Sequence, residues 1–220
     1  MTRWLLVVLA LSGVAQGTPK RGYHADNMPR GWHWPPNREM EAAAHACEAK
    51  LGELGVTWKT HEREGHIVDA ITVPEGQLGG IQYIAEYRSN DPVMDCQLVL
   101  ALASVAPALY DVGVREVHVG STYRWSNIRV GGKTKNILSR HALGLAMDVV
   151  SFVDANGREA IVSTDYKKQD PLLLDVERVV NASGIFRTVL TPKNDPKSHH
   201  DHFHLEANPD YSRVDAKPSS

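Results

Sequence analysis

The chain has little net charge, and this excludes one class of partner. Among 220 residues, 24 Lys and Arg nearly balance 26 Asp and Glu, so the net charge is −2 with neutral histidines. Nucleic-acid-binding proteins usually carry a basic face, so we expect no nucleic acid as a partner. The local basic residues Lys133, Lys135 and Arg140 are expected to form a solvated surface loop, because short charge runs seldom mean more.

Long apolar segments are also missing, apart from one short run at the start of the chain. Arg3 precedes the apolar residues 4–14, and the small-residue sequence Ala15-Gln16-Gly17 follows them. This pattern is typical of a secretory signal peptide cleaved after Gly17. The run is too short to cross a membrane comfortably, and no later segment is long enough. We therefore expect residues 1–17 to be a signal peptide, no transmembrane segment, and an exported protein that is periplasmic or secreted.

Cysteine is scarce, since the chain has only Cys47 and Cys96. A cysteine pair in an exported protein usually forms a disulfide, and closing a loop of this length stabilises a fold by about 4 kcal/mol. A catalytic thiol is the alternative. It is disfavoured because Cys47 lies on the apolar stripe of a predicted helix.

The hydrophobic pattern predicts one α+β domain, residues 37–210, with a mainly antiparallel sheet and helices packed on it. Residues 18–36 are expected to form an extended N-terminal arm, residues 211–220 a C-terminal tail, and the protein a monomer. Helices are predicted from Asn37 to Leu54, from Asp95 to about Tyr110, and from Pro171 to Gly184. Strands are predicted over residues 55–58, 67–73, 81–87, 115–124, 145–153, 159–163, 185–190 and 202–206.

Histidines are concentrated in the segment KSHHDHFHLE, residues 197–206. His202 and His204 are two residues apart, so on a strand they point to the same face. Both can then bind one metal ion, or one can bind it while the other faces what the ion holds. The alternative is a polar loop or a histidine-rich tract that binds metals weakly.

A second candidate cluster is SRHALGLAMD, residues 139–148, which contains His141 and Asp148. On a straight helix the two would be about 10 Å apart, and on an extended strand more than about 20 Å apart. Ligands of one zinc ion lie near 2 Å from it, so neither conformation allows a shared ion. Either the two residues are unrelated, or the chain doubles back between them, which Gly144 makes possible.

Together these motifs, S-x-H-x-x-G-x-A-x-D and H-x-x-H-x-H, resemble those of zinc peptidases with the hedgehog/D-Ala-D-Ala-peptidase fold, peptidase family M15. The chain is still more similar to the bacterial extensin-like family, through GVTW, MDCQLVLAL, GSTYRWSN, FRTVL and HDHFHLE, over most of residues 45–206. It departs from these relatives in lacking a cysteine near Arg124 and another near Ser183. Some relatives also have glutamate where this chain has Asp201.

The resemblance implies one zinc ion per chain, held by His141, Asp148 and His204. His202 would be the catalytic base or would stabilise the transition state, and Asp201 is the alternative base. Arg124 and Ser139 are expected on the substrate side. His199 would either contact the substrate or support the metal ligands from outside.

The activity implied is a zinc metallopeptidase that hydrolyses amide bonds in peptidoglycan stem or cross-link peptides, as a D,D- or L,D-carboxypeptidase or an endopeptidase. Three protein ligands leave one zinc position open for water, and a neutral imidazole nearby can accept its proton. The alternative is a non-catalytic, metal-stabilised cell-wall or protein binding module, in which His202 becomes a fourth ligand.

Overall fold

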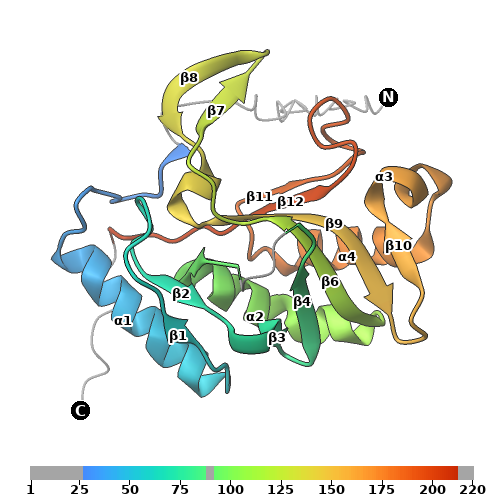
Figure 1. Ribbon diagram of the computed structural model, residues 1–220, viewed down its shortest axis with the longest axis horizontal. Coiled ribbons are helices and arrows are strands. Elements are labelled where there is room, and N and C mark those ends of the chain that lie inside the picture. Colours follow the sequence, from blue (N-terminus) through green and yellow to red (C-terminus); the bar gives the residue numbers. More distant parts are fainter. Residues whose placement is uncertain (1–26, 88–91, 213–220) are drawn as a thin grey trace, which may run out of the picture.

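A seven-stranded sheet lies at the centre of the computed structural model, which describes residues 27–87 and 92–212 (Figure 1). The strands follow the order β11-β12-β9-β6-β4-β3, and β10 also pairs with β9. They are β3 (Gln77–Leu78), β4 (Ile81–Ala85), β6 (Val114–Ser121), β9 (Ala146–Asp154), β10 (Glu159–Ile161), β11 (Thr188–Leu190) and β12 (Phe203–Glu206). Only β4 and β6 pair in parallel within this sheet, so the predicted mainly antiparallel α+β fold is confirmed.

Two small sheets flank the main one. One contains β1 (Lys59–Thr60), β2 (Ala70–Thr72) and β5 (Met94–Asp95), and the other is a hairpin of β7 (Asn127–Val130) and β8 (Lys133–Leu138). The strand predicted at residues 55–58 is wrong, since the first strand begins at Lys59. The hairpin was not predicted, because its strands are short and largely exposed. Its one sequence signal is the Gly131-Gly132 turn, where both residues have positive φ.

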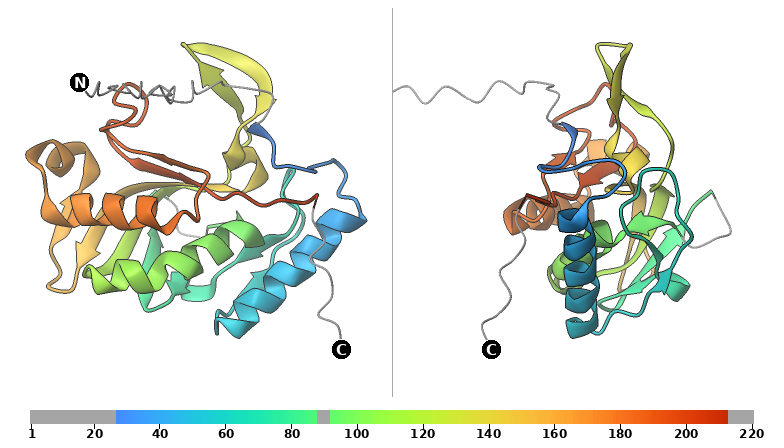
Figure 2. Two further views of the ribbon diagram at one scale, coloured as in Figure 1. Left: turned by 180° about the vertical axis from the view of Figure 1, so that it is seen from behind. Right: turned by 90° about the vertical axis from the view of Figure 1, so that its left-hand side faces the viewer.

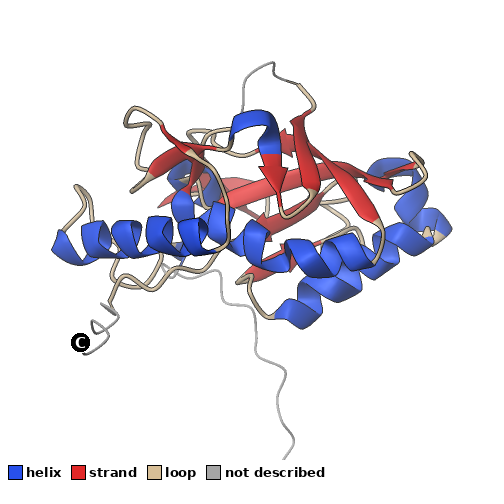
Figure 3. Cartoon of the chain, turned by 90° about the horizontal axis from the view of Figure 1, so that it is seen from below, coloured by secondary structure: helices blue, strands red, loops and turns tan. Residues whose placement is uncertain are grey.

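The three longer helices pack on one side of the main sheet. They are α1 (Arg38–Glu53), α2 (Cys96–Asp111) and α4 (Pro171–Ser183), and the single turn α3 (Val162–Asp165) follows β10. Figure 2 shows α2 and α4 side by side, with α1 next to α2, and Figure 3 shows helices on one side of the strands. The predicted starts of these helices are confirmed: Asn37, Asp95 and Asp170 each accept a backbone N–H at a helix start, and left-handed Gly184 ends α4 as predicted.

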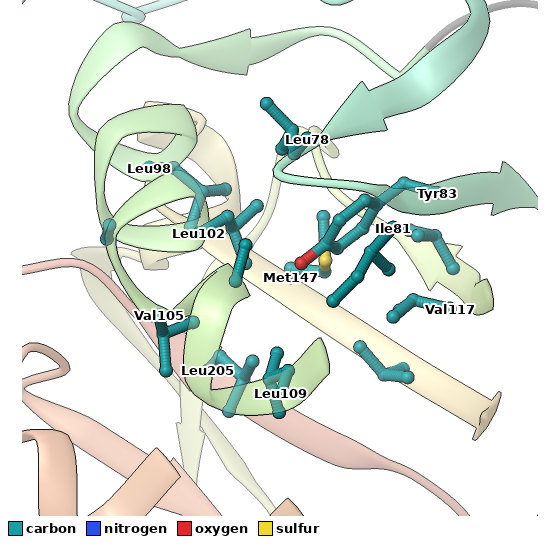
Figure 4. Close-up of a cluster of buried hydrophobic side chains, with 14 of the residues drawn as sticks. Leu78, Ile81, Tyr83, Leu98, Leu102, Val105, Leu109, Val117, Met147 and Leu205 are labelled. Atoms are coloured by element: carbon teal, nitrogen blue, oxygen red, sulfur yellow. The ribbon is translucent and has the colours of Figure 1, made fainter. Parts of the chain in front are cut away.

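The apolar face of α2 supplies much of the core. Leu98, Leu102 and Leu109 of this helix face strand residues such as Val117 and Met147 (Figure 4). Because strand side chains alternate in direction, the neighbours of these core residues point to the opposite face of the sheet. The candidate metal ligands are placed on that opposite face.

A disulfide joins Cys47 of α1 to Cys96, the first residue of α2, with a Cα–Cα distance of 6.1 Å. The predicted disulfide is thus confirmed. Because the chain has no other cysteine, the alternative of a catalytic thiol is excluded.

The described part of the N-terminal arm docks against the end of the domain. Arg30 forms a bridge with Asp210, and the Tyr211 amide donates to the Arg30 carbonyl. Tyr211 is buried, so this residue belongs to the domain and not to the expected tail. The proposed signal peptide, residues 1–17, lies outside the described residues, and among those described no helix combines the length and apolarity needed to cross a bilayer.

Arg140 corrects the expectation of a solvated basic loop. Lys133 and Lys135 are exposed, but Arg140 is only 1% exposed, and its guanidinium donates to the Ala207 carbonyl at 3.3 Å. Burial lowers the pKa of Arg140 to about 10, while the charge of Glu206 acts in the opposite direction. A charged side chain is tolerated there because a buried carboxylate lies nearby.

Candidate metal centre

His141 lies in a short turn between β8 and β9, the 3-10 helix Arg140–Leu143. The Ser139 hydroxyl caps this turn by accepting from the His141 amide at 3.3 Å. Gly144 ends it with a φ of +65°, and a Cβ at this position would lie 2.8 Å from the Asp95 backbone nitrogen. The chain therefore doubles back after His141, as the spacing between His141 and Asp148 required.

Strand register brings the other two candidate ligands together. β12 lies beside β9 and pairs antiparallel with it (Figure 1). In this register His204 lies directly opposite Asp148. On the other side of β9, the register with β6 shifts between Val119 and Ser121, which is a β-bulge around Gly120. A bulge redirects the side chain that follows it, and the Ser121 hydroxyl donates to Asp148 Oδ2 at 2.8 Å.

The donor atoms of His141, Asp148 and His204 all lie within 4.8 Å of one another, and all three residues are buried. His141 Nε2 is 3.2 Å from Asp148 Oδ1 and 3.3 Å from His204 Nδ1. His204 Nδ1 is 2.8 Å from Asp148 Oδ1. Two ligands near 2.0–2.1 Å from a tetrahedral zinc ion are about 3.3 Å apart, so these separations fit a shared ion.

The remaining ring nitrogens are held by partners outside the cluster. His141 Nδ1 lies 2.6 Å from the Thr122 carbonyl oxygen, to which it can only donate, so the lone pair is on Nε2. His204 Nε2 lies 3.2 Å from Glu206 Oε1, which favours a lone pair on Nδ1 for metal binding. Such outer contacts are usual behind histidines that bind a metal. This donor set fits zinc.

Glu206 is a residue of the centre that the sequence reasoning missed. It lies on the same strand face as His204, two residues later, and this spacing is the signal that could have found it. Its other oxygen, Oε2, accepts from Arg187 at 2.5 Å. Burial alone would raise the pKa of Glu206, but His204 and the neighbouring arginines lower it to about 2. The carboxylate therefore stays charged.

The electrostatics of the three candidate ligands favour a cation. Burial raises the pKa of Asp148, but the neighbouring imidazoles of His141 and His204 outweigh this and hold the pKa well below its usual range. Burial lowers the pKa of His141, which keeps that imidazole neutral. Burial also disfavours protonation of His204, yet Asp148 and Glu206 raise its pKa to about 9. A metal ion at His204 Nδ1 would displace this proton.

His202 stands beside the three candidate ligands and outside their group. Its Nε2 is 3.5 Å from Asp148 Oδ1, while its Nδ1 lies 2.7 Å from Asp201 Oδ1. The hydrogen bond from His202 lowers the pKa of Asp201, so this carboxylate is anionic. An anionic Asp201 favours a proton on His202 Nδ1 and leaves Nε2 facing the centre.

The three residues implied on the substrate side all lie near the centre. The Arg124 guanidinium is 3.5 Å from Asp148 Oδ2. The His199 ring lies 4.9 Å from His202 and 5.2 Å from His204, measured between centroids, and its Nδ1 contacts Asp195. Ser139 caps the turn that carries His141. A role of these residues in binding substrate stays a prediction.

A comparison with protein families matches residues 45–214 to the model described as Extensin-like protein C-terminus. The protein is a member of the extensin-like family. Comparisons with curated proteins and with solved structures gave no significant match. The part of this extensin-like protein that matches the family contains all three candidate ligands, Arg124 and the histidine-rich segment.

Proposed function

We propose that this extensin-like protein is an exported, zinc-dependent peptidase that hydrolyses amide bonds in peptidoglycan peptides. The proposal includes the hedgehog/D-Ala-D-Ala-peptidase fold, one zinc ion per chain, and a monomer. A single observation carries it. The buried donor atoms of His141, Asp148 and His204 converge on one point. A fourth residue, His202, points its Nε2 toward the Asp148 carboxylate but does not belong to this group of donors.

The proposed ligands are His141 Nε2, an oxygen of Asp148 and His204 Nδ1. When bound, zinc supplies a Lewis acid that lowers the pKa of a water molecule and polarises a carbonyl oxygen. Ser121 supports the free oxygen of Asp148, and Glu206 orients His204. These contacts keep the donor atoms in place.

His202 is the proposed general base. Its Nε2 takes a proton from the attacking water and can return it to the leaving amine, while Asp201 stabilises the imidazolium through Nδ1. Arg124 is the proposed cation for negative charge that develops on the carbonyl oxygen, or for the terminal carboxylate of a carboxypeptidase substrate. His199 lies on the same side and is a proposed substrate contact.

Peptidoglycan is proposed as the substrate on two grounds. The motifs resemble those of zinc peptidases that act on cell-wall peptides, and the apolar start of the chain predicts export to the compartment of these peptides.

The second candidate function is a metal-stabilised binding module. It is favoured by the short distance of 3.5 Å between His202 Nε2 and Asp148 Oδ1, because a small shift would make His202 a fourth ligand. A closed tetrahedral site is typical of structural zinc and has no position for a reacting water.

The deciding experiment incubates the purified, zinc-loaded protein with muropeptides and reads the product masses. We expect products that differ from the substrate by hydrolysis of one amide bond, loss of activity with a chelator, and recovery with added zinc. The masses also separate loss of a terminal D-alanine from cleavage of a cross-link. A protein that holds one zinc per chain and releases no product would contradict the peptidase and favour the binding module.

A further inference from the structure

A cleft of about 430 Å³ lies next to the candidate metal centre. Ser121, Thr122 and Arg124 line the cleft, and each also contacts a candidate ligand: Ser121 and Arg124 reach Asp148, and the Thr122 carbonyl accepts from His141. A molecule bound in the cleft would therefore lie directly beside the candidate metal centre. Another part of the wall comes from the loop between β1 and β2, which carries His61 and Glu64.

Close packing fixes Glu64 in this wall. The Tyr123 hydroxyl lies so near Gly65 that a Cβ at this position would be 2.2 Å from it, and Gly65 has a φ of +51°. Any other residue at this position would push Tyr123 away. Tyr123 also forms a hydrogen bond with Glu64. The loop is thus docked on Tyr123, and the Glu64 carboxylate, half-buried, faces the cleft.

Trp125 forms an aromatic part of the same wall. Its side chain is 59% exposed, yet His66 packs against it with ring centroids 4.7 Å apart, and Trp34 packs against His66 at 4.3 Å. In Figure 1 the loop that carries His66 lies beside the N-terminal segment that carries Trp34. Because His66 supports one side of Trp125, the exposed area of the indole is held in position beside the cleft.

We infer that this cleft binds a peptide residue with an aliphatic stem and a terminal primary ammonium group. Glu64 pairs with the ammonium, and Trp125 covers the methylene groups of the stem. Glu64 is the one acidic residue among the described residues that line the cleft, and within the described chain it has no cationic partner. A carboxylate at this position also disfavours an acidic side chain.

The inference rests on the proposed function, because a peptidase supplies the reason for a peptide in the cleft. It adds a specificity residue, Glu64, that takes no part in holding the metal. A diamino acid of the cell-wall peptides has the required stem and ammonium. Its recognition beside the centre would select the peptide before any bond is cut.

The test compares two peptides in binding, so that it does not depend on turnover. A pentapeptide with L-lysine at its third position and its L-norleucine counterpart, which keeps the stem and lacks the charge, are titrated by calorimetry into the His202→Ala variant. We expect the lysine peptide to bind about tenfold more tightly, as for a charged hydrogen bond at a half-exposed site. Glu64→Gln in the same background should abolish this preference.

Glu62→Gln is the matched control, since Glu62 is exposed, belongs to the same loop and does not line the cleft. It should keep the lysine preference. Trp125→Ala should lower the affinity for both peptides by a similar factor, because the indole is proposed to contact the aliphatic stem that both peptides have. Circular dichroism checks that each variant is folded.

Equal binding of the two peptides, or a preference that survives Glu64→Gln, would overturn the inference. The outcome is separable from that of the proposed function. A lysine preference in the His202→Ala variant, with no cleavage of either peptide by the zinc-loaded wild-type protein, contradicts the peptidase and supports the binding site. Hydrolysis of both peptides with equal kcat/KM and equal affinity supports the peptidase and contradicts the role of Glu64.

Discussion

His202 and His204 are two residues apart, but they lie in contrasting surroundings. His204 lies within β12, its side chain is 8% exposed, and both of its ring nitrogens contact buried carboxylates. His202 precedes the strand, is 19% exposed, and contacts Asp201, which is 50% exposed. Pairing of strands fixes the first histidine, whereas the second sits at the end of a loop with its partner in solvent. In the proposed function, metal binding is assigned to the buried region and proton transfer to the loop.

The largest expected effect comes from the buried histidine. His204→Ala removes a candidate ligand and leaves Asp148 and Glu206 as buried carboxylates without their shared partner. We expect zinc content to fall from about one per chain to a background level, activity to disappear, and the thermal unfolding temperature to drop. Metal analysis and calorimetry check this. A variant that keeps one zinc per chain would show that His204 is not a ligand.

The second prediction concerns His202, the more exposed of the two histidines. His202→Ala leaves His141, Asp148 and His204 in place, so zinc should stay near one per chain. Hydrolysis of muropeptides should nevertheless fall roughly 10²–10⁴-fold, as for the loss of a general base. Loss of zinc from this variant would make His202 a ligand and favour the binding module. Retention of both zinc and activity would transfer the role of base to Asp201.

Of the two regions, the buried one that contains His204 was more predictable from the sequence than the loop that contains His202. A spacing of seven residues between His141 and Asp148 allowed a shared ion only if the chain turned back, and Gly144 supplied that turn. The two-residue period of a strand placed His202 and His204 on one face. What the sequence could not give was the register, because the pairing of His204 with Asp148 depends on strands that are far apart in the chain.

Residues whose surroundings are formed by distant segments were misjudged or missed. Arg140 looked like part of a surface loop, but the carbonyl of Ala207 and the charge of Glu206, both far along the chain, make its burial possible. Glu206 was not predicted, since its contact with His204 depends on the strand conformation of both residues. The bulge at Gly120, which aims Ser121 at Asp148, has no clear sequence signal.

The third prediction tests whether the contact between Glu206 and His204 raises the affinity for zinc. Glu206→Gln keeps the shape of the side chain but removes the charge that faces His204 Nε2. We expect zinc affinity to fall about 10–100-fold, measured by competition with a chelating dye, while activity at saturating zinc changes less. Glu159→Gln is the control, because Glu159 contacts His118 and Ser151 and no candidate ligand. Equal zinc affinities of Glu206→Gln and Glu159→Gln would show that Glu206 does not support zinc binding.

The smallest expected effect belongs to the exposed carboxylate. Asp201→Asn keeps an oxygen that can accept from His202 Nδ1, so the ring stays oriented and only the charge is lost. If Asp201 acts through His202, kcat/KM should fall by about tenfold or less, because one charged hydrogen bond becomes a neutral one. Zinc content should not change. His200→Ala is the control, since His200 is exposed and lies 4.0 Å from Asp201 without contacting the centre. A fall as large as that of His202→Ala would make Asp201 itself the base.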